Sequence, residues 1–206
     1  MKPRILFLLA ILLLNESCAK IYYTPDAYSL AQSHKLIAVI PPTVSIAANK
    51  HVDAKSMKEQ QKTESTNFQQ EIYSWMLTRK MQGKITQDIL DIDQTNFILN
   101  KAGFPDSLLS VEELCRILNV DGIIKSNFSL SKPMSDGGAV VLALFGAYGS
   151  TNEIHVSMNI HDRKTNKLIW NFDHKFSGTI GSSPSRLVDA LMRYASKKMP
   201  YMILKP

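Results

Sequence analysis

The sequence predicts an α+β domain with a mixed, largely antiparallel sheet and helices packed mainly on one of its faces. Three observations support this fold class: a short apolar run before two prolines, several stretches with helical spacing, and a long alternating hairpin. The predicted order is strand, helix, strand, two helices, strand, an insert, two strands and a final helix, which is typical of α+β folds. The 206 residues suffice for one domain with its own core.

The first half of the predicted domain opens with a buried strand at 35–40. Its wholly apolar, β-branched composition is typical of a strand covered on both faces. The polar stretch 43–66 is predicted to be a loop or a loosely held helical extension. An amphipathic helix is expected over 68–83, followed by a second strand over 85–92.

Two shorter helices and a third strand follow. Asp93 is a suitable N-cap for a short helix that Gly103 would close. Ser110 and Glu113 have the spacing of a capping box ahead of another apolar stripe. The run 123–130 then predicts the third strand.

The clearest hairpin joins 154–161 to 168–176 through the turn 162–167. Apolar and polar residues alternate in both runs, which is typical of antiparallel strands packed on one side. Ser183 followed by Pro184 predicts the start of a last helix. The buried stripe of that helix is expected to contain Leu187, Val188, Leu191, Met192 and Ala195.

The N-terminus predicts export from the cytoplasm. Two basic residues precede an apolar run at 5–14, which is shorter than the roughly 20 residues needed to span a bilayer. A basic start with a short apolar core is typical of a signal peptide rather than a membrane anchor. The segment ends at Cys18 and resembles a bacterial lipoprotein signal, in which that cysteine is acylated. An ordinary secretory signal cleaved near Ala19 is the alternative.

The predicted organisation is a lipoprotein-type signal peptide at 1–17, a lipid-anchored linker at 18–34 and a single domain at 35–206. The residue after Cys18 is not the aspartate that acts as a retention signal in some bacteria. We therefore expect an outer-membrane anchor with the domain facing the periplasm.

The net charge and the cysteine count limit the classes of partner and of covalent bond that can be expected. The formal net charge is +6, but nucleic acid is not an expected partner outside the cytoplasm, whereas anionic envelope polymers would be. With Cys18 carrying lipid, Cys115 is left as a single cysteine, so no internal disulfide is expected. Cys115 is predicted to be a small buried hydrophobe.

An apolar, glycine-flanked insert at 134–150 interrupts the domain. Its core, 137–149, contains seven consecutive apolar residues and could be a buried edge strand, a partner or membrane contact, or a strand of a pore. The run does not alternate, which weighs against a pore with a wet lumen. The candidate contact residues are Val140, Val141, Leu142, Leu144, Phe145 and Tyr148.

No catalytic or metal-binding signature occurs in the sequence. Nucleophile-elbow, phosphate-loop and zinc-protease motifs are all missing. His155 and His161 share the polar face of one predicted strand, but six residues place them about 20 Å apart, too far to share a metal. His174 is expected to be a core or rim histidine with its hydrogen bonds satisfied rather than a metal ligand. The sequence therefore predicts a protein without catalytic residues, metal or cofactor.

Three motifs, in order, resemble a superfamily of bacterial envelope proteins. The run 35–42 is similar to the family's "AVLPF"-type strand, 113–125 to its helix-to-strand element "LGADYVLxG", and 159–170 to "LxDxxTGxVxW". The superfamily includes the curli-secretion channel lipoprotein, the lipoprotein activator of penicillin-binding proteins and the N-terminal domain of the Tol-system propeller protein. Asn119 and Asn166 replace the family's glycines, and asparagine tolerates a positive φ better than most residues.

This resemblance implies an anticodon-binding-domain-like sandwich and a non-catalytic accessory or assembly role in the envelope. The implied partners are the outer membrane, through the lipid anchor, other envelope proteins and further copies of the chain. Two alternatives stay open: a subunit of an oligomeric, curli-type secretion channel, and a periplasmic activator of a cell-wall synthase.

Overall fold

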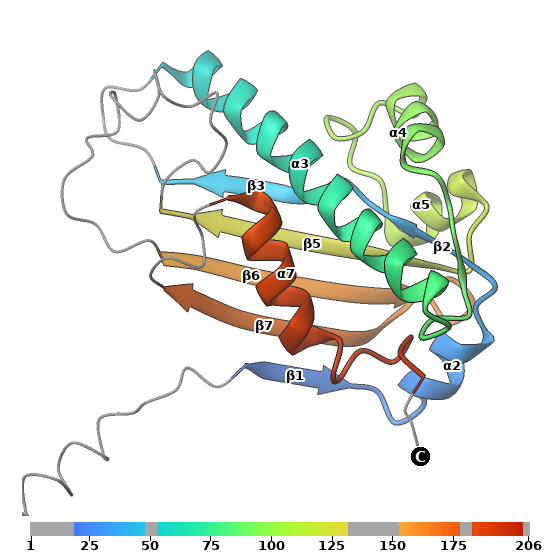
Figure 1. The fold of residues 1–206 in the computed structure, drawn as a ribbon. Helices are drawn as coiled ribbons and strands as arrows, with labels where there is room; N and C mark the ends of the chain where they lie inside the picture. Colours follow the sequence, from blue (N-terminus) through green and yellow to red (C-terminus); the bar gives the residue numbers. More distant parts are fainter. Residues whose placement is uncertain (1–18, 48–52, 132–152, 178–182, 204–206) are drawn as a thin grey trace, which may run out of the picture.

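The computed structural model describes residues 19–47, 53–131, 153–177 and 183–203. Within these ranges, seven strands form one mixed sheet in the order β1-β7-β6-β5-β2-β4, and β3 pairs with β5 (Figure 1). The strands are β1 (Lys20–Tyr23), β2 (Leu36–Val39), β3 (Thr43–Ile46), β4 (Asp88–Ile89), β5 (Gly122–Leu130), β6 (Glu153–Asp162) and β7 (Lys167–Ser177). The helices are α2 (Ala27–Ser33), α3 (Ala54–Met81), α4 (Ile92–Lys101), α5 (Val111–Leu118) and α7 (Pro184–Ala195).

The sheet has an antiparallel half and a parallel half. The long ladders between β5 and β6, β6 and β7, and β7 and β1 are antiparallel. The short strands β2 and β3 pair one after the other along the same side of β5, both parallel to it, and β4 is parallel to β2. The predicted α+β class with a mixed, largely antiparallel sheet is confirmed.

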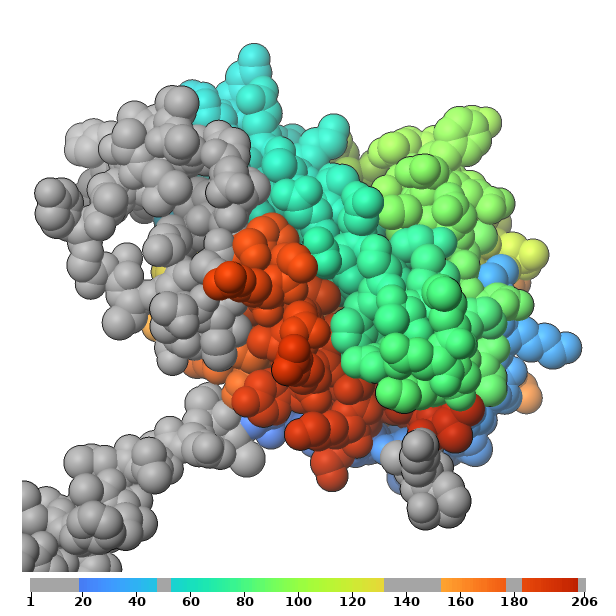
Figure 2. All heavy atoms as spheres, viewed as in Figure 1, coloured from blue at the N-terminus to red at the C-terminus, as the bar shows by residue number. Residues whose placement is uncertain are grey.

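The main core lies between the sheet and the helices α2, α3 and α7. Figure 2 shows α3 and α7 side by side over this face. The rings of Phe68 on α3 and Phe128 on β5 stack with centroids 4.1 Å apart. The five apolar residues predicted for the last helix are all buried here. Burial of this stripe and of the strand residues facing it removes apolar surface from water and stabilises the fold.

A second, smaller core lies on the opposite side of β2. Ile37 and Val39 point into the main core, whereas Ala38 and Ile40 point into the second one, as the alternation of a strand requires. Helices α4 and α5 cover it. The expectation of helices mainly on one face thus holds for α2, α3 and α7, while α4 and α5 cover the other face of β2. The residues packed there include Leu99, Leu114, Cys115, Leu118 and Ile123.

The predicted capping box and the two asparagines expected at positive φ are confirmed. The Ser110 side chain accepts the N–H of Glu113, and the Glu113 carboxylate accepts the N–H of Ser110, which completes the predicted capping box. Asn119 and Asn166 have φ angles of 52° and 58°. Asparagine therefore takes the left-handed conformation at both of these positions, as its tolerance of a positive φ allows.

The predicted hairpin of β6 and β7 is confirmed, with one local difference. The register shifts between Ile160 and His161, which adds a residue to β7 at this point. As a result, the consecutive residues Ile169 and Trp170 are both fully buried. Simple alternation had placed Ile169 on the polar face.

The linker predicted at 18–34 is wrong from Lys20 onward, because this segment belongs to the domain. β1 pairs with β7, and α2 buries Ala27 and Ala31 in the main core. An edge strand of four residues with only every second residue half-buried leaves little hydrophobic pattern. That is why the segment looks like a polar tether in the sequence.

Two further boundaries differ from the prediction. In the stretch 43–66, the helical alternative is confirmed from Ala54 onward, where α3 begins, but Thr43–Ile46 forms β3, which was not expected. The strand expected over 85–92 is reduced to two residues, and Asp91 rather than Asp93 caps α4, by accepting two backbone N–H groups. Among the described helices, none is long and apolar enough to cross a membrane.

The N-terminal segment is fastened to the segment after α7. The Tyr23 hydroxyl donates to the C=O of Lys198 at 2.7 Å, and the Gln32 amide donates to the C=O of Pro200 at 2.7 Å. Segments far apart in the sequence thus lie side by side next to β1 (Figure 1).

Candidate functional site: a lysine-lined groove beside α3

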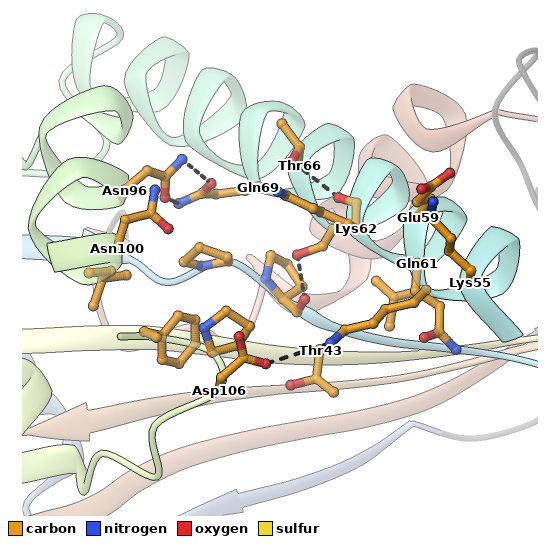
Figure 3. Close-up of a pocket in the computed structure, with 18 residues that line it drawn as sticks. Thr43, Lys55, Glu59, Gln61, Lys62, Thr66, Gln69, Asn96, Asn100 and Asp106 are labelled. Carbon is orange, nitrogen blue, oxygen red and sulfur yellow. Dashed lines mark hydrogen bonds and ion pairs between the residues drawn. The ribbon is translucent and has the colours of Figure 1, made fainter. Parts of the chain in front are cut away.

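A groove of about 690 Å³ lies between the first half of α3, the β2–β3 junction and the loop after α4 (Figure 3). Its lining combines lysines, amides, hydroxyls and a few apolar groups. The lining residues used below are Pro42, Thr43, Val44, Lys55, Lys58, Glu59, Lys62, Ser65, Gln69, Asn96 and Asp106.

The lysines of the groove share one face of α3. Lys55, Lys58 and Lys62 are three and four residues apart, the spacing of neighbours along a helix surface. The helix starts at Ala54 because Asp53 caps it, accepting the N–H of Ser56 at 2.9 Å. This cap orders the polar first half of α3, and so it holds all three lysines over the groove.

Two prolines form the floor. Pro41 and Pro42 lie between β2 and β3, where the chain leaves one strand and starts the next along the same side of β5. Pro42 has no N–H group, but its C=O accepts a hydrogen bond from the Ser65 hydroxyl at 2.6 Å. This bond fastens the middle of α3 to the β2–β3 junction.

A pair of amides closes one end of the groove. The amides of Gln69 on α3 and Asn96 on α4 exchange two hydrogen bonds, of 3.0 and 2.9 Å. Gln69 also donates to the C=O of Val39 at 2.8 Å and is only 1% exposed. These bonds satisfy a buried amide and fix the distance between the two helices.

The loop after α4 forms the outer wall. Gly103 turns the chain with a φ of +80°, and a side chain there would overlap Ser107. The loop brings Asp106 across the groove, where its Oδ1 atom lies 3.7 Å from the Nζ atom of Lys58. Both side chains are more than 80% exposed, so this ion pair contributes little to stability.

These groups suit binding rather than catalysis. The lining offers ammonium groups, amides and hydroxyls, and the Ser65 and Thr66 hydroxyls of α3 donate to backbone C=O groups rather than to a base. Throughout the described part of the chain, no group of three His, Cys, Asp or Glu residues could hold a metal ion. The groove can hold a polar, anionic ligand against a partly apolar floor.

A polar cluster elsewhere has the composition of a catalytic triad but is sealed in the core. His34 lies between the Tyr201 hydroxyl, 2.9 Å away, and the Asp162 carboxylate, 2.8 Å away. Burial opposes ionisation of Asp162, but hydrogen bonds from Thr165 and His34 outweigh it and lower its pKa. Burial raises the pKa of Tyr201 well above its ordinary value. No substrate can reach these groups, so the cluster is structural.

The structure settles several candidates from the sequence. His174 lies beside Phe172 and Phe176, as predicted, but its Nδ1 atom is buried without a hydrogen-bond partner among the described residues, so it is not the satisfied histidine that was expected. His155 pairs with Asp173 at 2.9 Å.

Cys115 is fully buried in the second core, as predicted. Burial raises the pKa of its thiol to about 11, so a thiolate nucleophile is not available there. Cys18 and the contact residues Val140, Val141, Leu142, Leu144, Phe145 and Tyr148 lie outside the described residues.

Sequence reasoning missed the groove, because its walls come from three separate segments. One signal was present: lysines at helical spacing within the polar stretch 43–66. Helices are recognised in a sequence by an apolar stripe, which this polar stretch lacks. The lysine spacing therefore did not identify the helix as one wall of a binding site.

Comparisons with known proteins give faint structural likenesses. The chain matches no protein-family model, and no curated protein matches it significantly. A PelC dodecamer from Paraburkholderia phytofirmans is 11% identical, with a TM-score of 0.42, and the match covers 92% of this chain and 100% of that one. The lipoprotein GNA1162 from Neisseria meningitidis is 12% identical, with a TM-score of 0.43, covering 80% and 99%. The C-terminal domain of LpoB from Escherichia coli is 12% identical, with a TM-score of 0.34, covering 74% and 98%. Likenesses of this size identify neither a family nor a function for the chain.

Proposed function

We propose that this protein is a non-catalytic lipoprotein of the bacterial envelope, anchored to the outer membrane through acylated Cys18 and acting as an accessory or assembly subunit through protein contacts. The observation that carries the proposal is the position of β1. It begins at Lys20, so a single residue separates the domain from Cys18. A lipid on Cys18 would therefore hold the domain against the membrane without a spacer.

The topology of the sheet supports a second contact at the same end. β1 starts opposite Asp173 and runs toward Trp170, so the chain comes to β1 from the end of the sheet where β7 finishes. β5 ends and β6 begins at that same end, since Leu130 pairs with Ile154. The apolar insert 134–150 connects these two strands.

We therefore propose that the insert contacts the membrane or a membrane-bound partner. The strands on either side of the insert meet it at the end of the sheet from which the chain enters β1, so its apolar residues, Leu142 and Leu144 among them, are our candidates for this contact. Replacing both leucines by aspartate is expected to abolish membrane or partner association and to leave the domain folded. Loss of the fold would instead indicate a buried strand.

Metabolic labelling tests the anchor directly. Cells producing the full-length chain are grown with radiolabelled palmitate, and the label is expected on the wild type but not on Cys18→Ser. Cys115→Ser is the matched control, because it removes the other cysteine and should keep the label. Label that persists in Cys18→Ser, or is missing from the wild type, contradicts the proposal.

A further inference from the structure

The outer edge of β3 is open to the groove. Within the part of the chain that the structure describes, β3 pairs with β5 alone, so its other edge has no strand partner. Thr43 and Val44 of this strand line the groove beside α3. An open strand edge presents backbone donors and acceptors to whatever lies next to it.

One hydrogen bond defines which backbone groups face the groove. The N–H of Ala47 donates to the C=O of Leu130 at 2.8 Å, so Ala47 turns toward β5. Successive residues of a strand turn their backbone groups to alternate sides, so Ser45 shares the direction of Ala47. The N–H and C=O groups of Val44 and Ile46 therefore turn away from β5. Val44 and Ile46 are two residues apart, so their free backbone groups repeat about every 6.6 Å along the strand. The backbone groups of an extended peptide have the same repeat.

A side chain of α3 already bonds to one of the backbone groups that turn away from β5. The C=O of Pro42, two residues before Val44 and on the same side, accepts the Ser65 hydroxyl at 2.6 Å. Further toward the start of α3 the two elements separate, and the groove of about 690 Å³ lies there. Its polar and partly apolar lining would suit a short extended segment.

The charge of the lining selects an acidic occupant. The lining holds three lysines against two carboxylates, Glu59 on the same helix and Asp106 on the loop after α4, so the groove is slightly basic. Of the three lysines, Lys58 forms an ion pair with Asp106. Among the described residues, neither Lys55 nor Lys62 forms an ion pair. Acidic side chains on an added strand would complement these two ammonium groups.

We infer that the groove binds an extended, acidic segment of a partner protein, which adds as a strand to the outer edge of β3. The open backbone row favours a peptide over a sugar chain, because a sugar does not offer N–H and C=O groups at this repeat. The inference rests on the proposed function only in taking a protein as the partner. The palmitate test and the peptide test can therefore fail separately.

Hydrogen exchange of individual amides gives the sharpest test. The full-length, ¹⁵N-labelled protein in mild detergent is mixed with a synthetic octapeptide of alternating glutamate and valine, up to about 1 mM, to detect weak binding. The amides of Val44 and Ile46 are expected to exchange at least about tenfold more slowly, which corresponds to about 1.4 kcal/mol of protection. The amide of Ala47, already bonded to β5, should not change.

Matched variants separate charge from backbone pairing. Lys55→Gln with Lys62→Gln should weaken binding about tenfold, as expected for losing two charges beside the ligand. Lys164→Gln with Lys167→Gln, which removes two exposed lysines in the β6–β7 turn and at the start of β7, should leave binding unchanged. The same peptide methylated on alternate backbone nitrogens should not bind.

Three results would overturn the inference. Unchanged exchange at Val44 and Ile46 at the highest peptide concentration would show that no strand is added. Slow exchange of these amides before any peptide is added would show that the chain covers its own edge. Equal binding of the methylated peptide, or of an oligogalacturonate probe, would show a site for anions that does not use the strand edge.

Discussion

The Nε2 atom of His34 lies 2.8 Å from the Oδ1 atom of Asp162, and both side chains are only 2% exposed. The other oxygen of Asp162 accepts the backbone N–H and the hydroxyl of Thr165. The carboxylate is thus fully bonded in the core and joins the end of β6 to the chain ahead of β2. A buried ion of this kind is tolerated only because its partners compensate for lost water.

Removing this carboxylate should strongly destabilise the domain. Asp162→Ala is expected to lower the free energy of unfolding by about 3–5 kcal/mol, because it leaves His34 and the Thr165 groups without their acceptor. Asp173→Ala is the control: its partner His155 is 43% exposed, and an exposed pair is worth at most about 1 kcal/mol. Urea unfolding measures both, and equal losses would contradict the argument.

The same group makes stability depend on acidity. The folded-state pKa of Asp162 is lowered, so its contribution is present above the ordinary pKa of about 4 and is lost as the pH falls through the folded value. Urea midpoints measured from pH 7 down to about 3 should fall more steeply for the wild type than for Asp162→Asn. Parallel curves would assign the acid sensitivity to other carboxylates.

Gly122 has no room for a side chain. A Cβ atom there would lie 2.5 Å from the Cε1 and Nδ1 atoms of His34 and 2.8 Å from the Tyr201 hydroxyl. Gly122→Ala is therefore expected to cost about 1–3 kcal/mol by overpacking. In a His34→Ala background the two closest contacts are removed and the Tyr201 hydroxyl can shift into the space left by the imidazole, so the cost should become smaller. Additive costs in the double variant would place the strain elsewhere.

His174 weakens the domain in mild acid. Its Nδ1 atom is buried without a hydrogen-bond partner among the described residues, and burial lowers the pKa of the imidazole. Because the unfolded chain takes up a proton below about pH 6.5 and the folded one resists it, stability falls with pH in that range. His174→Phe should raise the unfolding midpoint and flatten its dependence between about pH 5 and 7. A wild-type curve with the same slope as that of His174→Phe would contradict this assignment.

The buried thiol offers a check on the second core. Cys115 is fully buried, and its pKa of about 11 leaves almost no thiolate at neutral pH. A maleimide should therefore label Cys115 only in urea, and at the rate at which the domain opens. Rapid labelling in native buffer would show that α4 and α5 leave this core open.

Local signals in the sequence predicted local structure well. The capping box at Ser110, the proline at the start of α7 and the β6–β7 hairpin depend on neighbouring residues, and the sequence contains them side by side. The edge strand β1 is held by its pairing with β7, more than 140 residues away, so its own four residues carry little pattern.

The groove could not be predicted for the same reason. Gln69 and Asn96 form their reciprocal amide pair only after α3 and α4 have packed against β2. Asp106 reaches Lys58 through a turn that depends on Gly103. Spacing within one segment cannot reveal a site whose parts belong to three segments.

The bonds from Tyr23 to Lys198 and from Gln32 to Pro200 bear on the order in which the domain is made. A chain exported from its N-terminus delivers β1 and α2 first, yet their partners are β7 and the segment after α7. Such distant contacts close slowly, because a long loop must be ordered first. If Cys18 is acylated, the lipid would anchor the chain while β1 is still an unpaired strand, and the fold would close at the membrane as its last strand and helix arrive.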